Sequence, residues 1–232
     1  MRKNFGTKSW FYPLPVLIIA TFNEDGTADA MNAAWGGLYD ADKVVLCLSA
    51  GHKTTENIQK RRAFTVSFAD AAHVIPADYV GMVSAHNEAD KMEKAGFHVT
   101  KSEYVDAPLI DELPVTLECR LLKVNEDGNI IGQIVNVSAE ENVLGADGSI
   151  DFTKFHPISF EPAHNAYHVL GEKVGNAFQA WQSTENCGYF ITAPQPFTGR
   201  PRWKRDIRTA LLQSWTKPGR NIRWRITSFP LM

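Results

Sequence analysis

The sequence contains no long hydrophobic segment. Its longest apolar run, 14-LPVLIIA-20, is far shorter than the ~20 residues that a membrane-spanning helix needs. Residues 1–10 also lack the apolar segment and small-residue cleavage site of a signal peptide. We therefore predict a cytoplasmic protein without a membrane span.

Cysteine is scarce. Cys47, Cys119 and Cys187 are widely spaced and form no metal-binding or redox motif. Cys47 and Cys119 lie in apolar alternations, where a free cysteine acts as a small hydrophobic residue. This usage favours a reducing compartment and argues against a disulfide framework.

Several common catalytic motifs are absent. The phosphate-binding pattern GxxxxGK[ST], the dinucleotide pattern GxGxxG and the zinc pattern HExxH do not occur. His164 and His168 are four residues apart, but they lie in an extended segment, so we expect no metal site. Ser84 lies outside a GxSxG motif and has no evident His and Asp partners, which argues against hydrolysis by a nucleophilic serine.

Charge is unevenly distributed along the chain. Residues 1–182 contain 15 Lys and Arg against 24 Asp and Glu, a net charge of −9. Residues 183–232 contain 9 against 2, a net charge of +7, with three Trp among the Arg. We predict a body, residues 1–182, and a basic C-terminal extension, residues 183–232. Three interpretations of the extension stay open: a surface for nucleic acid or another polyanion, a poorly ordered segment with one short helix, or sequence without a selected function.

The body is rich in β-strand patterns. Apolar or alternating runs predict strands at 15–22, 28–37, 43–50, 63–69, 115–124, 130–138 and 165–171. Asp-Gly pairs in 23–27 and 126–129 predict hairpin turns. Only two short helices are expected, at 54–62 and 87–96. The pattern predicts a mainly β fold with short helices, of the barrel type, rather than a doubly wound α/β sheet.

One polar segment begins where an apolar run ends and a helical pattern starts, at 49-SAGHKTTENIQKRR-62. A helix N-terminus leaves about four backbone N–H groups unpaired and favours an anion. Here Thr54 is a suitable N-cap and Lys53 adds a positive charge. The other polar side chains of the segment are Ser49, His52, Thr55 and Asn57. The segment suits a phosphate group, although helix capping alone also explains it.

Two neighbouring segments suit a flat ring. In 31-MNAAWGG-37, small residues allow a ring to approach the backbone, and the Asn amide can bond to its edge. Trp35 is expected either to stack on that ring or to lie in the core. In 80-VGMVSAHNEADK-91, Ser84 stands beside small residues and Lys91 follows.

The order of these motifs resembles the flavoredoxin branch of the flavin reductase-like family, whose members are FMN-binding split β-barrels with a Greek-key-like arrangement. The resemblance extends from about Trp10 to about Phe178. The matching motifs are NAAW (32–35), S-x-x-x-K-T-x-x-N (49–57), DYVGMVS (78–84), ADK (89–91), APLI (107–110), PVTLEC (114–119), GQIVNV (132–137) and YHVLGEKVGNAF (167–178).

The resemblance implies a role for each matching residue. The FMN phosphate would be held by Lys53, Thr54, Thr55 and Asn57, with Ser49 and His52 beside them. The edge of the isoalloxazine ring would be held by Asn32, Ala33, Ala34 and Trp35, and Ser84 and Lys91 match the next motif. Many relatives have Arg where this chain has Lys53, and lysine lacks the two-pronged guanidinium.

The resemblance also implies a homodimer with the flavin near the subunit interface. Three functions are weighed. The first is an NAD(P)H-dependent flavin reductase, in which N5 of FMN accepts hydride without a protein acid or base. The second is an electron carrier of the flavoredoxin type that does not oxidise NADH or NADPH. The third is a nucleic-acid-binding module acting through the basic extension. His168 is expected in the core or an interface rather than beside the flavin.

Overall fold

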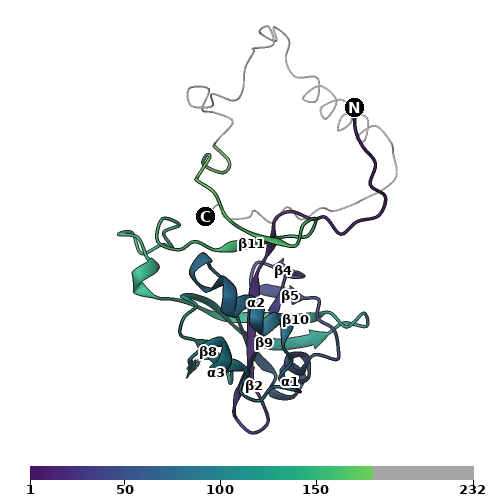
Figure 1. Cartoon of the computed structure of the whole chain (residues 1–232). Coiled ribbons are helices and arrows are strands. Elements are labelled where there is room, and N and C mark those ends of the chain that lie inside the picture. The colour runs from purple at the N-terminus through teal and green to yellow at the C-terminus, as the bar shows by residue number, and fades with distance from the viewer. Residues whose placement is uncertain (180–232) are drawn as a thin grey trace, which may run out of the picture. The chain divides into compact units, whose positions relative to one another are not determined.

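The computed structural model describes residues 1–179, and Met1–Glu172 form one compact unit. Its centre is an antiparallel sheet of seven strands in the order β3-β2-β6-β9-β10-β5-β4 (Figure 1). The mainly β fold with short helices is therefore confirmed. The strands are β2 (Leu17–Phe22), β3 (Ala28–Ala33), β4 (Gly36–Asp40), β5 (Lys43–Leu46), β6 (Ala63–Phe68), β9 (Val115–Val124) and β10 (Ile130–Ala139).

The large sheet curls. Its edge strand β4 is separated from β2 by four strands, yet Gly36 of β4 lies against Leu17 of β2. A Cβ atom at Gly36 would be 3.0 Å from Leu17 Cδ1 and 3.0 Å from Leu46 Cδ2. Glycine therefore allows the two ends of the sheet to approach each other, as in a partly closed barrel.

Two smaller sheets and three α-helices complete the unit. β1 (Leu14–Pro15), β11 (Ile158–Glu161) and β12 (Ala166–Val169) form one sheet, and β7 (Val99–Lys101) and β8 (Pro108–Ile110) form the other. The helices are α1 (Lys53–Arg61), α2 (Val74–Met82) and α3 (Lys91–Ala95), with 3₁₀ turns at Ala71–His73 and Glu141–Val143. The predicted extension, residues 183–232, lies outside the described residues.

Both predicted hairpins are present. In the first, Asn23 N donates to Thr27 O over 2.8 Å, and Gly26 takes a φ of +87°, which glycine adopts without strain. In the second, Asn125 N donates to Asn129 O over 2.8 Å. Each turn fixes the register of the long strands on either side of it.

Some elements differ from the predictions. The expected strand 28–37 is two strands, because the chain leaves β2 after Ala33 and pairs with β5 from Gly36 onward. Helix α2 was not predicted: it is apolar on most sides and contains Pro76 in its first turn, a position that tolerates proline. The strands β7, β8 and β11 are only three or four residues long, too short for a periodic pattern.

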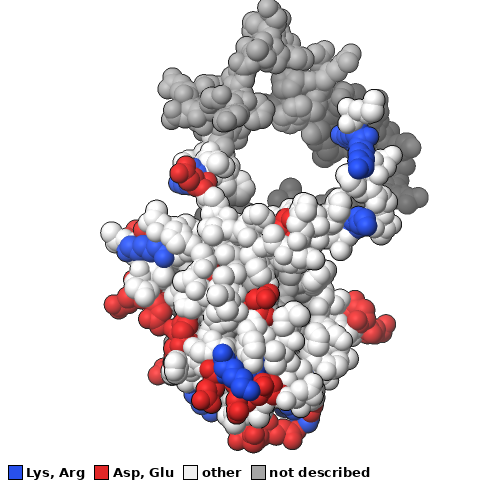
Figure 2. All heavy atoms as spheres, viewed as in Figure 1, with Lys and Arg blue, Asp and Glu red and all other residues white. Residues whose placement is uncertain are grey.

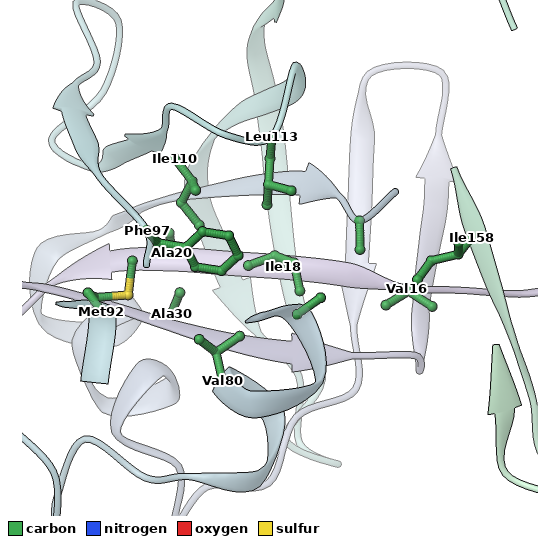
Figure 3. Close-up of a cluster of buried hydrophobic side chains, with 12 residues drawn as sticks. Val16, Ile18, Ala20, Ala30, Val80, Met92, Phe97, Ile110, Leu113 and Ile158 are labelled. Carbon is green, nitrogen blue, oxygen red and sulfur yellow. The ribbon is translucent and has the colours of Figure 1, made fainter. Parts of the chain in front are cut away.

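Strand β2 is buried on both faces. Val16, Ile18 and Ala20 belong to one apolar cluster, in which α2 and α3 contribute Val80 and Met92 (Figure 3). Leu17 and Ile19 face the opposite cluster, which contains Phe64, Leu46 and Ile130. The sheet therefore has a core on each side, and helices α2 and α3 cover one of them.

Polar groups are also buried. Glu118 of β9 is 1% exposed; Asn136 Nδ2 donates to its Oε1 over 2.6 Å, and the Ser102 hydroxyl donates to its Oε2. Burial, and then the charge of Glu118, raises the pKa of Cys119 to about 12. Cys47, expected to act as a small hydrophobic residue, is instead exposed. On the visible surface, Asp and Glu side chains line much of the lower edge of the body (Figure 2).

Candidate functional site

A cavity of about 260 Å³ brings together residues from β3, α1, α2 and α3. These elements are distant in the sequence but adjacent in the fold. The cavity is lined by Asp29, Met31, Asn32, His52, Lys53, Thr54, Val80, Gly81, Met82, Val83, Ser84, Ala85 and Lys91. Six residues singled out in the sequence therefore meet here: Asn32, His52, Lys53, Thr54, Ser84 and Lys91.

The other six lie outside the lining of the cavity. Ala33 is buried in the core beside Leu17, and Ala34 follows it at the end of β3. Trp35 is 51% exposed, so it is not a core residue. The remaining three are Ser49, Thr55 and Asn57, which bond within the protein.

The first turn of α1 forms one end of the cavity. The helix begins at Lys53, and its N-cap is His52 in an extended conformation, without a capping side-chain bond. The prediction of Thr54 as N-cap is therefore wrong, because Thr54 is the second residue of the helix. The first backbone bond of the turn runs from Glu56 N to His52 O. Within residues 1–179, the N–H groups of 53, 54 and 55 have no acceptor, which favours an anion at this end.

The two threonine hydroxyls at this turn bond to other parts of the protein. Thr54 Oγ1 donates to Asp29 Oδ2 over 2.6 Å, and Thr55 Oγ1 donates to the carbonyl of Ser49 over 2.9 Å. A hydroxyl has one hydrogen to donate. In this arrangement neither threonine side chain has a hydrogen left for a ligand.

Asn57 fixes the helix to the first hairpin. Its Nδ2 donates to Asn23 Oδ1 over 2.8 Å and to Thr21 Oγ1 over 3.2 Å. Its Oδ1 is buried and accepts no bond from the described residues. Asn57 therefore holds α1 in place against β2 instead of lining the cavity, in agreement with the position of the helix beside the hairpin in Figure 1.

The cavity contains a buried ion pair. Asp29 Oδ1 lies 3.2 Å from Lys91 Nζ, and the two side chains are 0% and 4% exposed. Asp29 was not singled out in the sequence, where it is a lone acidic residue in a strand pattern. Its two bonding partners, Thr54 and Lys91, are 25 and 62 residues away along the chain.

Asn32 and Gly81 form the opposite end. Asn32 Nδ2 donates to the carbonyl of Ala77 over 3.0 Å. A Cβ atom at Gly81 would lie 2.9 Å from Asn32 Cβ, so only glycine allows α2 to approach β3 this closely. This end of the cavity is therefore formed by the backbone of α2 packed directly against the Asn32 amide.

Tyr167 of β12 supports Asn32 from outside the cavity. Its hydroxyl donates to Asp78 Oδ1 over 2.8 Å. Burial, and then the bond to the Asp78 carboxylate, raises the pKa of Tyr167 to about 12, and a hydrogen bond with Asn32 acts in the opposite direction. The three side chains thus connect β3, α2 and β12.

Three further polar groups line the cavity. Lys53 Nζ lies 3.4 Å from Glu56 Oε1, with its side chain 20% exposed. Ser84 Oγ accepts a bond from His86 N over 3.3 Å, which leaves its own hydrogen available. His52 is exposed. Together with the free N–H groups and Lys91, these side chains make the α1 end of the cavity rich in hydrogen-bond donors and positive charge.

His168 is exposed on β12, away from the cavity lining, so it is not a core histidine. No group of three or more His, Cys, Asp or Glu within residues 1–179 is arranged to hold a metal ion. Within the same residues, no helix is both long and apolar enough to cross a membrane.

Comparison with known proteins places this chain in a family. The model of the flavin reductase like domain matches residues 9–161 of the chain. The chain belongs to the flavin reductase-like family, and the resemblance seen in the sequence is confirmed.

Solved structures agree with this assignment. Flavoredoxin of Desulfovibrio vulgaris (Miyazaki F) is 34% identical with a TM-score of 0.75, and the match covers 78% of this chain and all of that one. Flavoredoxin from Methanosarcina acetivorans is 27% identical with a TM-score of 0.71, covering 79% and 99%. An FMN-binding domain of a flavin reductase-like enzyme from Shewanella baltica OS155, 19% identical with a TM-score of 0.62 over 70% and 89%, shares the fold. The split-barrel fold is therefore confirmed.

Proposed function

We propose that this chain binds FMN in the cavity between β3, α1 and α2 and acts as an NAD(P)H-dependent flavin reductase. The observation that supports the proposal is that the two ends of one cavity differ in chemistry. One end offers free backbone N–H groups and lysines, and the other is formed by the Asn32 amide packed against Gly81. FMN has a phosphate at one end and a flat ring at the other.

The α1 end fits a phosphate monoester. The three N–H groups at the start of α1 point along the helix axis, where the helix dipole favours negative charge. Lys53 and Lys91 add two ammonium groups, and Ser84 a hydroxyl. Thr54, Thr55 and Asn57 contribute by holding the turn in position, since their side-chain donors are already bonded.

The other end fits a ring with polar edges. Asn32 Nδ2 donates to the carbonyl of Ala77, and its Oδ1 can accept a bond from a ligand. The missing side chain at Gly81 allows α2 to pack directly against Asn32, which holds the amide in place at this end of the cavity. When bound, FMN would supply the redox chemistry, with a nicotinamide cofactor as the source of hydride. The protein's part is to orient the ring, and we assign no acid or base.

An electron carrier of the flavoredoxin type is the second candidate. It is favoured by the 34% identity to a flavoredoxin over the whole length of that protein. Anaerobic stopped-flow mixing of the FMN-loaded protein with NADH and with NADPH separates the two. Rapid loss of the flavin absorbance supports the reductase, whereas unchanged absorbance with both donors supports the carrier.

We also propose a homodimer. Strand β4 is an edge of the large sheet, and Trp35, Leu38 and Tyr39 on or beside it are 51%, 73% and 53% exposed. An exposed apolar edge of this kind is commonly covered by a partner. Sedimentation of the wild-type protein and of Leu38→Lys tests this. A dimer that becomes a monomer supports the proposal, and a wild-type monomer at all concentrations contradicts it.

A visible absorption spectrum is the direct test of FMN binding. The purified protein, mixed with FMN and dialysed, should keep bands near ~370 and ~450 nm, which belong to oxidised flavin. Lys53→Met should weaken FMN binding about tenfold, the value of one charged hydrogen bond. Riboflavin, which lacks the phosphate, should bind as before. Lys123→Met, an exposed lysine of β9, is the control. A colourless protein that binds neither flavin would contradict the proposal.

A further inference from the structure

The buried pair of Asp29 and Lys91 is not explained by FMN binding alone. An anion site gains nothing directly from a carboxylate in its wall, because the two negative charges repel each other. Yet Asp29 is fully buried, and both of its oxygens accept bonds: Oδ1 from Lys91 and Oδ2 from Thr54. Removing one partner of such a pair leaves a buried charge without compensation, which is strongly destabilising.

Asp29 accepts bonds from the same donor groups that a phosphate would use, namely Thr54 and Lys91. The Thr54 hydroxyl has a single hydrogen and gives it to the carboxylate over 2.6 Å. Lys91 gives one of its three N–H groups to Asp29, which also neutralises its charge. A phosphate oxygen that approaches Lys91 or Thr54 therefore competes with Asp29.

We propose that Asp29 is the counter-ion of Lys91 and that it lowers the affinity of the cavity for the flavin phosphate. FMN then exchanges with solution. In the empty protein Asp29 stabilises the buried ammonium; in the loaded protein it limits the affinity. Asp29 is thus a positioning residue, because it acts on the ligand through Lys91 and Thr54. The inference rests on the proposed function, in that it takes the phosphate to lie at the α1 end.

Asp29→Asn tests the inference because it keeps the shape and removes the charge. The Asn oxygen can accept the bond from Lys91, and its NH₂ can donate to Thr54 Oγ1. The Thr54 hydrogen is then free for a ligand, and Lys91 has lost its counter-charge. We expect FMN to bind about ten- to a hundredfold more tightly, the range of one or two charged bonds, and to dissociate correspondingly more slowly. Riboflavin affinity should be unchanged.

Two variants accompany this test. Asp127→Asn, the control, removes one negative charge from the exposed turn between β9 and β10 and should leave the affinities for FMN and riboflavin unchanged. Asp29→Asn combined with Lys91→Gln should bind FMN at least about tenfold more weakly than Asp29→Asn, because the ammonium released by the first change is removed by the second. Equal FMN affinities of these two variants would overturn the inference. If Asp29→Asn alone fails to fold, Asp29→Ser, which is also neutral and is smaller, is measured in its place with the same expectation.

A second readout does not depend on flavin. Inorganic phosphate should raise the melting temperature of the empty Asp29→Asn protein more than that of wild type, because at equal concentration a ligand that binds more tightly stabilises the folded state more. Without phosphate the variant should melt at a lower temperature than wild type.

Several outcomes would overturn the inference. Weaker binding of FMN and riboflavin alike would show that Asp29 only supports the fold, and unchanged FMN binding would show that it does not compete. If phosphate stabilises the variant more than wild type while neither protein binds FMN, the counter-ion inference stands and the FMN proposal fails.

Discussion

Gly132 of β10 is the position where a single methyl group should most disturb the core. A Cβ atom there would lie 2.4 Å from Phe64 Cζ, 3.0 Å from Phe64 Cε1 and 3.3 Å from Val44 Cγ2. Phe64 is fully buried in the cluster with Leu46 and Ile130, so its ring has little room to move. Gly132→Ala therefore forces the ring or the strand to shift.

The expected cost is about 1–3 kcal/mol of unfolding free energy, the range for overpacking a filled core. A gain of about 0.4–1 kcal/mol from the stiffer unfolded chain opposes it but does not cancel it. Urea unfolding followed by fluorescence or circular dichroism measures the difference. Gly37→Ala in β4 is the control, because nothing lies within 4 Å of its Cβ position.

A double variant tests whether the clash with Phe64 causes the loss of stability. Phe64→Leu removes the ring atoms that clash with the new methyl group, so it should cost less in the Gly132→Ala protein than in wild type. If Gly132→Ala is as stable as wild type, or if the two changes simply add, the proposed close packing of β10 against Phe64 is refuted.

Two predictions remain. Gly81→Ala should weaken the binding of both FMN and riboflavin, because the new methyl group would lie 2.9 Å from Asn32 Cβ and displace the amide; equal binding by the variant would contradict the role given to that end of the cavity. The pKa of Tyr167 is raised from 10.0 to about 12, so its protonated form stabilises the fold fully below pH 10 and the contribution is lost as the pH rises toward 12. Stability measured across this range should fall less in Tyr167→Phe than in wild type, and equal slopes would argue against the shift.

Local sequence was sufficient to predict the hairpins and the first helix. Asp-Gly at the turns requires a positive φ at glycine, and Gly26 and Gly128 adopt it. Helix α1 begins one residue earlier than predicted. Helix α2 was missed because its residues are apolar on most sides, which leaves no helical period to recognise.

Several of the side chains that line the cavity could be identified from the sequence. The bonds that these side chains make there could not. Lys53 and Lys91, which the resemblance matched to the flavin site, both line the cavity; that they bind FMN stays a prediction. The use of the Thr54 hydroxyl was not predictable, because its acceptor lies 25 residues earlier in a strand, and a lone acid in a strand gives no indication of its partner. Bonds of this kind depend on tertiary structure, and a single sequence without that structure does not specify them.

The two ends of the cavity are formed by different segments of the chain. This difference affects the order in which the two ends fold during synthesis. The backbone of the α1 end depends on β2, β3 and α1, which lie within residues 17–61. Asn57 joins α1 to β2 and its hairpin turn, and Thr54 joins α1 to Asp29 of β3. The Asn32 end is supported by Tyr167, more than a hundred residues later. Chains fold largely from the N-terminus during synthesis, and contacts close in sequence form first. The backbone of the α1 end would therefore be shaped first, Ser84 and Lys91 would join it later, and the Asn32 end would become rigid only when the last strand has docked.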